Sequence, residues 1–512
     1  MIQMQNITIT HKKDLRELLK NFSFILREGD RAALIGEEGN GKSTLLKLIY
    51  DEALIEEYAQ YSGTIHKNGI HLGYLAQELS EAQKVQTVYE FCCGSGGFLD
   101  ASPKELGALA KDMGITMELF YSPQTMGSLS GGEKVKIRLA CILLEKPDVL
   151  LLDEPSNDID IETLEWLETL ICSSHIPVLY ISHDEMLLEK TANVIIHMEQ
   201  IRRKTLARYT ISRTDYRSYV SARQSNLTKQ EQQARNERLE FAKQQARFQK
   251  IQQKVEHQQN TISRQDPAGG RLLKKKMHAV KSMERRFEKE FESMTQRPET
   301  EDAIFFKFGE QIKMPAGKRV LDYKKEQLMV DGTVLAKDIH LEVIGPKHVC
   351  IVGKNGAGKS TMLKEIADQL LNREDLHVGY MPQNYEELLD LSQTPVEFLT
   401  VSGDKEERDR ISTYLGSMKY TADEMRHAVR ELSGGQKAKL LLLRMSMQQC
   451  DVLILDEPTR NFSPLSLPVI RRMLEEFPGA IISVSHDRKY IDEVCEEVYE
   501  LAKDGLKKKI RD

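Results

Sequence analysis

The chain has 512 residues, which is too long for a single hydrophobic core and indicates two or three domains. Hydrophobic residues make up 40% and charged residues 29%, as in an ordinary soluble globular protein. Apolar runs such as 149–152 fall far short of the roughly 20 residues of a membrane-spanning helix, and residues 1–12 do not resemble a signal peptide. Seven cysteines without metal or disulfide spacing favour reduced thiols and a cytoplasmic location.

The net charge of −6 conceals an uneven distribution of charge along the chain. Residues 217–297 contain 19 Lys and Arg against 9 Asp and Glu, a net charge of +10, so the remainder carries −16. A basic segment between two acidic regions predicts contact with a polyanion.

The first part of the chain has the pattern of an α/β domain. Apolar runs at 31–35, 149–152 and 178–181 predict buried strands. Helical patterns at 42–50 and 132–144 alternate with these strands. This alternation predicts a mostly parallel sheet covered by helices.

Residues 215–297 form a long polar stretch rich in Gln, Arg, Lys and Glu, interrupted only near its middle by Pro267, Gly269 and Gly270. The pattern predicts two long helices joined by a tip near 261–271. A first helix of about 45 residues would reach nearly 70 Å. Its sparse apolar positions indicate a hairpin that stands in solvent or against a partner.

The last part of the chain repeats the first. The string GEEGNGKS at 36–43 returns as GKNGAGKS at 353–360, and LSGGE at 129–133 returns as LSGGQ at 432–436. LLLDEP at 150–155 and ISHD at 181–184 return 303 residues later as LILDEP and VSHD. Two homologous domains at 1–212 and 301–512, separated by the linker at 213–300, follow from these repeats.

A phosphate-binding loop is indicated by Gly36, Gly41, Lys42 and Ser43, which fit the pattern G-x-x-x-x-G-K-S between a strand and a helix. Glycines let backbone N–H groups surround phosphates, the lysine reaches the outer phosphates, and the serine hydroxyl reaches Mg²⁺. The second copy of the loop and its downstream partners make a chance match negligible.

An acidic pair ends one apolar strand in each domain. Asp153 and Asp456 stand where an aspartate holds Mg²⁺ through water in P-loop enzymes. The following residues, Glu154 and Glu457, are placed to polarise the attacking water as general bases.

Together these motifs resemble the ATP-binding-cassette family over about 420 residues. The resemblance implies two cassettes paired head to tail within a monomer, with each ATP held between one phosphate loop and the other cassette's Ser-Gly-Gly. A helix N-terminus of this kind is an anion site that a γ-phosphate completes. It also implies that Gln77 and Gln383 sense Mg²⁺, and that His183 and His486 act in catalysis beside Glu154 and Glu457.

The resemblance assigns a full set of residues to the two ATP sites. The nucleotide would be held by Gly36, Gly39, Gly41, Lys42, Ser43, Thr44, Gln77, Ser130, Gly131, Gly132, Gly353, Gly356, Gly358, Lys359, Ser360, Thr361, Gln383, Ser433, Gly434 and Gly435. The Mg²⁺ sites would comprise Ser43, Gln77, Asp153, Ser360, Gln383 and Asp456.

The sequence departs from the family pattern in two places. Ser463 stands where the first domain has Asp160, which predicts unequal coupling between the two sites. No residue ahead of either phosphate loop is clearly identified as the aromatic side chain that would stack on adenine. The two candidates are His11 and Tyr323.

Two fused cassettes joined by a long charged hairpin resemble the ABC-F family. That resemblance implies binding at the E site of the 70S ribosome, with the hairpin directed towards the peptidyl-transferase centre and in contact with 23S rRNA and P-site tRNA. The basic excess is what phosphate contact requires. Candidate rRNA-binding residues near the tip are Arg264, Arg271, Lys274, Lys275 and Lys276.

Within that family the linker favours an antibiotic-resistance protein, because its extended tip carries apolar side chains at Ile262, Leu272, Leu273 and Met277. A housekeeping ABC-F translation factor is the alternative, although the stretch from Gln77 to Leu129 leaves little room for an additional arm. The sequence also leaves open an ATPase that serves a separate membrane transporter and a DNA-repair or chromosome ATPase, but we expect no membrane subunit.

Overall fold

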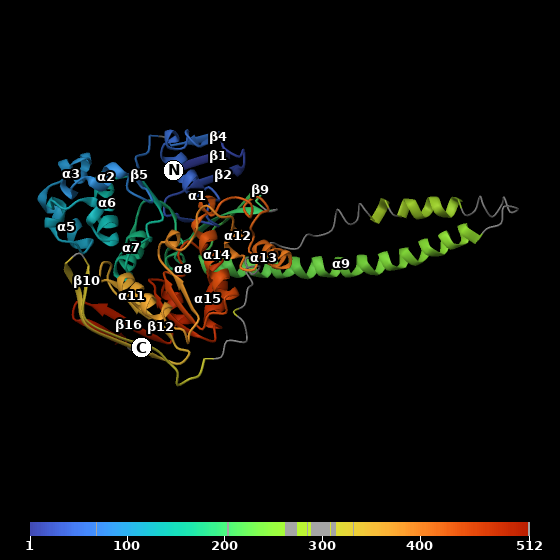
Figure 1. Cartoon of the computed structure of the whole chain (residues 1–512). Helices are drawn as coiled ribbons and strands as arrows, with labels where there is room; N and C mark the ends of the chain where they lie inside the picture. Colours follow the sequence, from blue (N-terminus) through green and yellow to red (C-terminus); the bar gives the residue numbers. More distant parts are fainter. Residues whose placement is uncertain are drawn as a thin grey trace. The chain divides into compact units, whose positions relative to one another are not determined.

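The computed structural model describes residues 1–67, 69–201, 204–261, 274–283, 285–287, 308, 314–330 and 332–509. The chain divides into two units (Figure 1). One unit combines Met1–Arg217 with Glu301–Asp512, and the other is Ser218–Thr300, referred to below as the hairpin arm. No helix among the described residues is long and apolar enough to cross a membrane.

A six-stranded sheet with the strand order β5-β6-β7-β3-β8-β9 forms the centre of the first cassette. Its strands are β3 (Arg31–Ile35), β5 (Leu72–Leu75), β6 (Val149–Asp153), β7 (Val178–Ile181), β8 (Val194–Ile201) and β9 (Leu206–Ser212). All neighbours are parallel except β8 and β9. Every residue of β6 is buried, as expected for a parallel strand covered on both faces.

Helices surround this sheet, and a second, antiparallel sheet packs against part of it. The helices are α1 (Lys42–Tyr50), α6 (Gly131–Leu144), α7 (Ile161–Ser173) and α8 (Glu185–Thr191). The antiparallel sheet has the order β2-β1-β4 and consists of β1 (Ile2–His11), β2 (Glu17–Leu26) and β4 (Ala59–His66). One apolar cluster joins this sheet, α1 and the inner strands into a continuous core.

The segment between the first sheet and α6 folds into short helices. These are α2 (Glu81–Val85), α3 (Val88–Cys93), α4 (Gly96–Asp100) and α5 (Pro103–Asp112). Ser80, Thr87 and Ser102 cap three of them with reciprocal hydrogen bonds, which explains why such short segments are helical.

The second cassette has the same sheet order, β13-β14-β15-β12-β16-β17. Its strands are β10 (Arg319–Val330), β11 (Thr333–Ile344), β12 (His348–Val352), β13 (Val378–Met381), β14 (Val452–Asp456), β15 (Ala480–Val484), β16 (Glu497–Ala502) and β17 (Gly505–Lys509). Its helices are α11 (Lys359–Leu371), α12 (Pro395–Leu399), α13 (Lys405–Ser417), α14 (Gly434–Met447), α15 (Leu467–Glu475) and α16 (Arg488–Val494). The predicted α/β class with two P-loop cassettes is confirmed.

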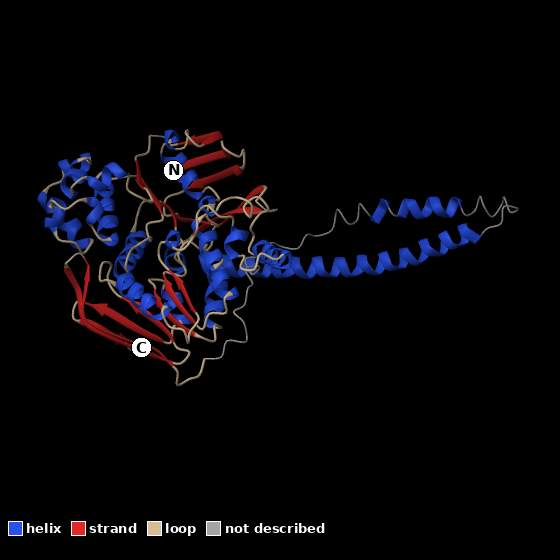
Figure 2. Cartoon of the chain, viewed as in Figure 1, coloured by secondary structure: helices blue, strands red, loops and turns tan. Residues whose placement is uncertain are grey.

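The hairpin arm is helical wherever it is described (Figure 2). Helix α9 (Tyr216–Thr261) has 46 residues, in agreement with the predicted length, and residues 274–283 and 285–287 are also helical. A small core of Phe248, Val255 and Val280 joins the two stretches, and the ring of Phe287 lies 5.2 Å from that of Phe248, centroid to centroid.

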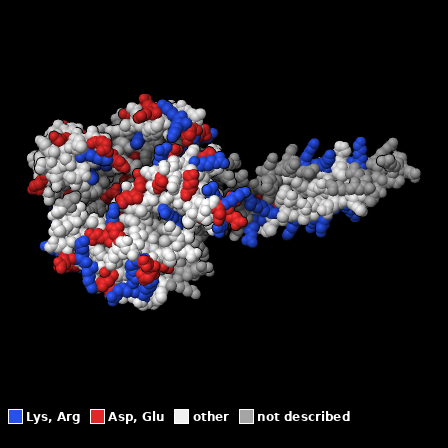
Figure 3. Space-filling model, in the orientation of Figure 1, with Lys and Arg blue, Asp and Glu red and all other residues white. Residues whose placement is uncertain are grey.

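One prediction about the arm was wrong, and others cannot be compared with the structure. Met277 was expected to be an apolar side chain of the tip, but it lies in the helical stretch 274–283 and packs against the Phe248 cluster, because burial against a partner helix removes an apolar side chain from water. Residues 274–276 are exposed, whereas the predicted tip and Arg264, Arg271, Ile262, Leu272 and Leu273 lie outside the described residues. Lys and Arg outnumber Asp and Glu on the described surface of the arm (Figure 3).

Candidate functional site

The first phosphate loop connects β3 to α1. At Gly36 the backbone angle φ is 144°, and an added Cβ would lie 2.2 Å from the carbonyl oxygen of Met198, so only glycine fits there. The Lys42 ammonium turns back into the loop and donates to the carbonyls of Gly36 at 2.9 Å and Glu37 at 3.0 Å. Gly41 precedes helix α1 and supplies no side-chain cap, so the first N–H groups of the helix are available to a phosphate.

The second phosphate loop repeats this geometry between β12 and α11. Gly353 has a φ of 148°, and Lys359 donates to the carbonyls of Gly353 at 2.8 Å and Lys354 at 3.0 Å. Gly358 precedes α11, again without a side-chain cap. The predicted residues of both loops therefore lie in equivalent positions, with Gly39 and Gly356 at the exposed bends and Thr44 and Thr361 in the first helical turns.

Oxygen atoms suited to a divalent cation lie beside the first loop. The Ser43 hydroxyl donates to Asp153 Oδ1 at 2.9 Å, and the Tyr74 hydroxyl lies 3.4 Å from the other carboxylate oxygen. Burial raises the pKa of Asp153 to about 6 despite the hydrogen bond from Ser43. A cation at this position would offset the cost of burying the carboxylate.

Glu154 is held by contacts on several sides. Its backbone φ of 50° is uncommon for a residue other than glycine. Its carboxylate accepts a hydrogen bond from the Gln77 amide at 3.0 Å and lies 3.3 Å from His183 Nε2. Burial alone would raise the pKa of Glu154, but His183 and Lys42 outweigh it and lower the pKa to about 2.

The equivalent residues of the second cassette are less well paired. Glu457 has nearly the same φ, 52°, but its carboxylate lies 3.9 Å from His486 Nε2. Among the described residues it accepts a 3.3 Å bond from the His486 backbone N–H and a 3.4 Å bond from the Ser485 hydroxyl. Burial, with the charge of Asp456, raises the pKa of Glu457 to about 8. Gln383 is exposed and makes no hydrogen bond within the described part of the chain.

Asp456 retains a buried polar atom that lacks a partner. Its Oδ1 makes no hydrogen bond to any described residue, although Ser360 hydrogen-bonds the carboxyl group. Burial raises the pKa of this aspartate as it does for Asp153. An unpaired buried carboxylate oxygen beside a serine hydroxyl fits a cation ligand, since buried polar atoms are otherwise almost always bonded.

The two Ser-Gly-Gly motifs begin α6 and α14. Ser130 and Ser433 cap these helices, each with a reciprocal bond to the residue three positions later. Gly131 must lack a side chain, because an added Cβ would lie 1.8 Å from the Asp158 carbonyl oxygen. The glycines thus expose helix N-termini as anion sites.

Contacts between the cassettes place each loop against the other cassette's Ser-Gly-Gly. Glu38 of the first loop accepts a 2.7 Å hydrogen bond from the backbone N–H of Gly435. In the other direction, the Asn355 amide donates to the Asp158 carbonyl at 2.6 Å, close to Gly131. The structure therefore brings together the residues that the head-to-tail arrangement requires.

His183 also bonds across the cassette interface. Its Nδ1 lies 2.7 Å from the backbone carbonyl of Phe462, in the loop that follows the second acidic pair. His486 has no such contact, because its buried Nδ1 lacks a partner among the described residues. Burial and the charge of Lys359 lower the pKa of His486 to about 4, so it is neutral at physiological pH.

The position of Ser463 shows what the missing aspartate changes. Asp160 caps α7 by accepting from the Thr163 N–H at 3.0 Å, whereas Ser463 bonds the Ser466 hydroxyl at 2.8 Å and α15 starts only at Leu467. Ser463 lies in a cavity between the cassettes, whose lining includes Glu37, Glu38, Lys204 and Ser433. The two adenine candidates have other partners: Tyr323 is buried and donates to Glu365, and His11 lies 3.1 Å from Asp14.

Sequence reasoning missed Glu38, Asn355 and Phe462 as residues of the cassette interface. The first two occupy equivalent positions of the repeated loop, one of three positions at which the two copies differ, and this difference was the available signal. Phe462 contacts His183 through its backbone carbonyl, and such a contact leaves no signature in the sequence.

The profile of the ABC transporter family matches residues 19–157 and 336–460, which is more than half of the chain. Each match spans a phosphate loop and an acidic pair. The chain therefore belongs to the ABC transporter family.

Relatives align with almost the whole chain. The ABC transporter F family member 5 of Arabidopsis thaliana is 26% identical over 98% of this chain and 75% of its own length. A ribosome protection protein of Bacillus subtilis, VmlR, is 27% identical over 97% of this chain and 86% of its own length. Within its family the chain is thus an ABC-F protein, and it is an ATPase.

A solved structure supports the tandem fold. The archaeal ribosome recycling factor aABCE1, in complex with the ribosomal stalk protein aP1, aligns with 98% of this chain and 89% of its own length, with a TM-score of 0.58. At 18% identity this similarity concerns the fold alone.

Proposed function

We propose that this ATPase binds the ribosome at the E site and protects the peptidyl-transferase centre from antibiotics. The proposal rests mainly on one observation: the same chain has two candidate ATP sites, each formed by residues of both cassettes, and a basic helical arm. The relative named as a ribosome protection protein covers nearly the whole chain and supports the same function. A cytoplasmic location follows from this proposal.

Each ATP would lie between the phosphate loop of one cassette and the Ser-Gly-Gly of the other. Lys42 and Lys359 would exchange their bonds to loop carbonyls for bonds to the outer phosphates. The N–H groups at Gly435 and Gly132 would then face the γ-phosphate. Binding ATP would therefore stabilise the closed pair of cassettes, by a free energy that grows with the logarithm of the ATP concentration relative to its dissociation constant.

Mg²⁺ would be held by Ser43, Asp153 and Gln77 in one site, and by Ser360, Asp456 and Gln383 in the other. The unpaired Oδ1 of Asp456 and the Ser43–Asp153 contact fit such an ion. When bound, the ion would supply charge neutralisation for the β- and γ-phosphates. No cluster of three or more His, Cys, Asp or Glu side chains among the described residues offers a separate metal site.

Hydrolysis would use Glu154 and Glu457 to orient and deprotonate the attacking water. His183 would keep Glu154 in place and, through Nδ1, connect it to the backbone of the opposite cassette. His486 would stand beside Glu457 with its Nε2 3.9 Å away, but its Nδ1 bonds no described residue of the opposite cassette. The closer contacts around Glu154 favour faster turnover at the first site.

The hairpin arm would contact 23S rRNA and P-site tRNA. Lys274, Lys275 and Lys276 are exposed and carry no competing ion pair in the described structure, and Arg264 and Arg271 extend the basic sequence. Lys and Arg neutralise phosphates and give salt-dependent affinity. Bound ATP would retain the protein on the ribosome, and hydrolysis would release it.

The ribosomal part of the proposal is tested by sedimentation. We expect Glu154→Gln together with Glu457→Gln to accumulate in the ribosome fraction with ATP, whereas Lys42→Ala together with Lys359→Ala stays in the supernatant. Equal distribution of both variants would refute ribosome binding. Recovery in a membrane fraction or on DNA instead would favour a transporter subunit or a chromosome ATPase.

Protection is tested separately by drug susceptibility. A sensitive bacterium that expresses the chain should tolerate a lincosamide, streptogramin A or pleuromutilin better than one that expresses the chain without residues 262–273. If both strains are equally sensitive while ribosome binding persists, the housekeeping translation factor is the better reading.

A further inference from the structure

A cluster of opposite charges joins the two cassettes away from the phosphate loops. The first cassette contributes Glu168 from α7 and Glu185 from α8, and the second contributes Arg471 from α15 and Arg488 from α16. Arg471 bonds Glu185, and Arg488 bonds Glu168. The cluster therefore consists of two reciprocal ion pairs.

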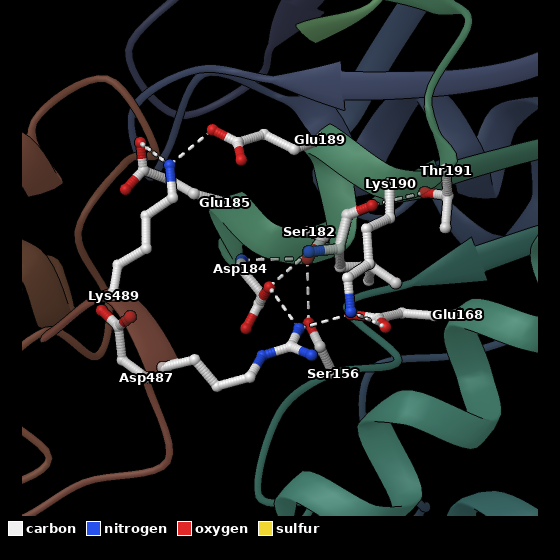
Figure 4. A network of polar contacts seen from close by, with 12 residues as sticks. Ser156, Glu168, Ser182, Asp184, Glu185, Glu189, Lys190, Thr191, Asp487 and Lys489 are labelled. Atoms are coloured by element: carbon white, nitrogen blue, oxygen red, sulfur yellow. Dashed lines mark hydrogen bonds and ion pairs between the residues drawn. The ribbon is translucent and has the colours of Figure 1, made fainter. Parts of the chain in front are cut away.

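Further contacts extend this cluster. Arg488 also lies 3.5 Å from Asp184, and Lys489 lies 3.8 Å from Glu185 and bonds Glu189. Figure 4 shows Lys489 reaching from the second cassette towards Glu185 and Glu189 on α8. Every acidic partner in these bonds comes from the first cassette, and every basic partner comes from the second.

The four central side chains are largely shielded from solvent. Their exposed fractions are 3% for Arg471, 6% for Glu185, 8% for Glu168 and 12% for Arg488. Shielding from water strengthens attraction between opposite charges and repulsion between like charges. The cross-cassette pair of Lys354 and Glu162, with exposed fractions of 77% and 72%, lacks this shielding.

The internal repeat relates these positions to one another. An offset of 303 residues carries Glu168 to Arg471 and Glu185 to Arg488, so the charge is inverted at both. By the same offset, Lys190 is equivalent to Glu493. Lys190 pairs with Glu168 at 2.7 Å in the first cassette, and Glu493 pairs with Arg471 at 2.6 Å in the second. The second cassette thus bears a charge-inverted copy of the first at three equivalent positions.

Inverted charges have a direct consequence for pairing. If two first cassettes paired in this geometry, Glu168 would face Glu185, and if two second cassettes paired, Arg471 would face Arg488. Both arrangements bring like charges together in a shielded interface, which is strongly unfavourable. Only a first cassette with a second cassette satisfies all four groups.

We propose that this charge-inverted cluster selects pairing between a first and a second cassette and excludes pairing between two identical cassettes. Because the phosphate loops and Ser-Gly-Gly motifs are nearly the same in both cassettes, the ATP sites themselves distinguish poorly between these arrangements. The partner that this surface fits is the complementary cassette of the same chain. The cluster thereby keeps the ATPase from assembling through identical halves.

The test exchanges charges in the full-length chain. Glu168→Arg, Glu185→Arg and Lys190→Glu give the first cassette the charges of the second, and Arg471→Glu, Arg488→Glu and Glu493→Lys do the reverse. Each triple variant keeps the attraction within its own cassette between positions 168 and 190 or 471 and 493. Each should lose at least tenfold in ATPase rate, while the variant with all six changes recovers to within about threefold of the native rate.

Mixing the two triple variants gives a second readout. Each chain alone has two cassettes of like charge, but the first cassette of one chain complements the second cassette of the other. The mixture should regain ATPase activity and double its mass by light scattering. As a control, Lys20→Glu, Lys84→Glu and Lys364→Glu reverse three exposed charges and should leave the rate unchanged.

Two results would overturn the proposal. In one, the triple variants retain the native ATPase rate, so the charges do not decide pairing. In the other, the triple variants are folded by circular dichroism but inactive, and neither the sixfold exchange nor mixing restores activity. The second result would mean that these residues serve each cassette separately.

Discussion

Glu38 offers the sharpest prediction about ATP binding. Its carboxylate accepts from the Gly435 N–H at 2.7 Å, the group that is expected to face the γ-phosphate of the first site. The second site has a neutral residue, Asn355, at the same position of the loop. We therefore predict that Glu38→Asn tightens ATP binding at the first site.

The size of the effect follows from the charge separation. A phosphate brought to the same N–H would place its charge about 5 Å from the carboxylate, and Coulomb's law at an effective dielectric constant of about 20 gives ~3 kcal/mol per unit charge. Glu38 is exposed, so screening reduces the effect to about 1.4 kcal/mol, or roughly tenfold in affinity. ADP lacks the γ-phosphate and should bind with little change.

The assay is titration of a fluorescent ATP analogue against a chain that carries Lys359→Ala, so that only the first site reports. Asn355→Glu, tested with Lys42→Ala, is the matched control and should weaken ATP binding at the second site. Equal affinities for ATP before and after Glu38→Asn would refute the reasoning. An equal gain for ATP and ADP would also refute it, since the γ-phosphate would then play no part.

Three further predictions concern stability. Burial would raise the pKa of Glu37, but Lys419, Lys439 and Lys204 outweigh burial and lower this pKa from 4.5 to about 2. The attraction between the Glu37 carboxylate and these lysines therefore stabilises the fold above pH 4.5, and the stabilisation is lost as the pH falls towards 2. Glu37→Gln should lower the free energy of unfolding at pH 7 by on the order of 2 kcal/mol. It should also reduce the decline of this free energy below pH 4.5, which urea titration at several pH values measures. An unchanged pH profile would contradict this prediction. Phe248→Ala should cost about 3 kcal/mol in the small core of the arm and speed hydrogen exchange at 274–283, whereas Leu239→Ala, at a 53% exposed residue, should not. Gly36→Ala should lower the melting temperature more than Gly39→Ala, because an added Cβ meets Met198 at 2.2 Å in the first case and nothing within 4 Å in the second.

Local patterns predicted much of the fold and of the candidate site. Strand β3 and helix α1 begin and end where hydrophobic periodicity and the phosphate loop place them, and α9 has close to its expected length. These elements depend on short stretches of sequence and on the repeat, which a single chain displays fully.

Features that depend on distant contacts could not be predicted in this way. His183 and Phe462 are 279 positions apart, and their contact exists only because the cassettes pair. The opposite pKa shifts of Glu154 and Glu457 follow from different burial and partners around the same motif. Met277 was misassigned because a polar helix conceals which of its few apolar side chains meet a partner helix.

The central claim is that ATP closes the two cassettes of one chain head to tail, and the exposed pair of Lys354 and Glu162 allows a direct measurement. Their charged atoms lie 2.9 Å apart across the interface, within reach of a zero-length carbodiimide cross-link. Mass spectrometry of the chain with Glu154→Gln and Glu457→Gln should show this cross-link in high yield with ATP and in low yield with ADP. The same yield with ATP, with ADP and without nucleotide would contradict the account.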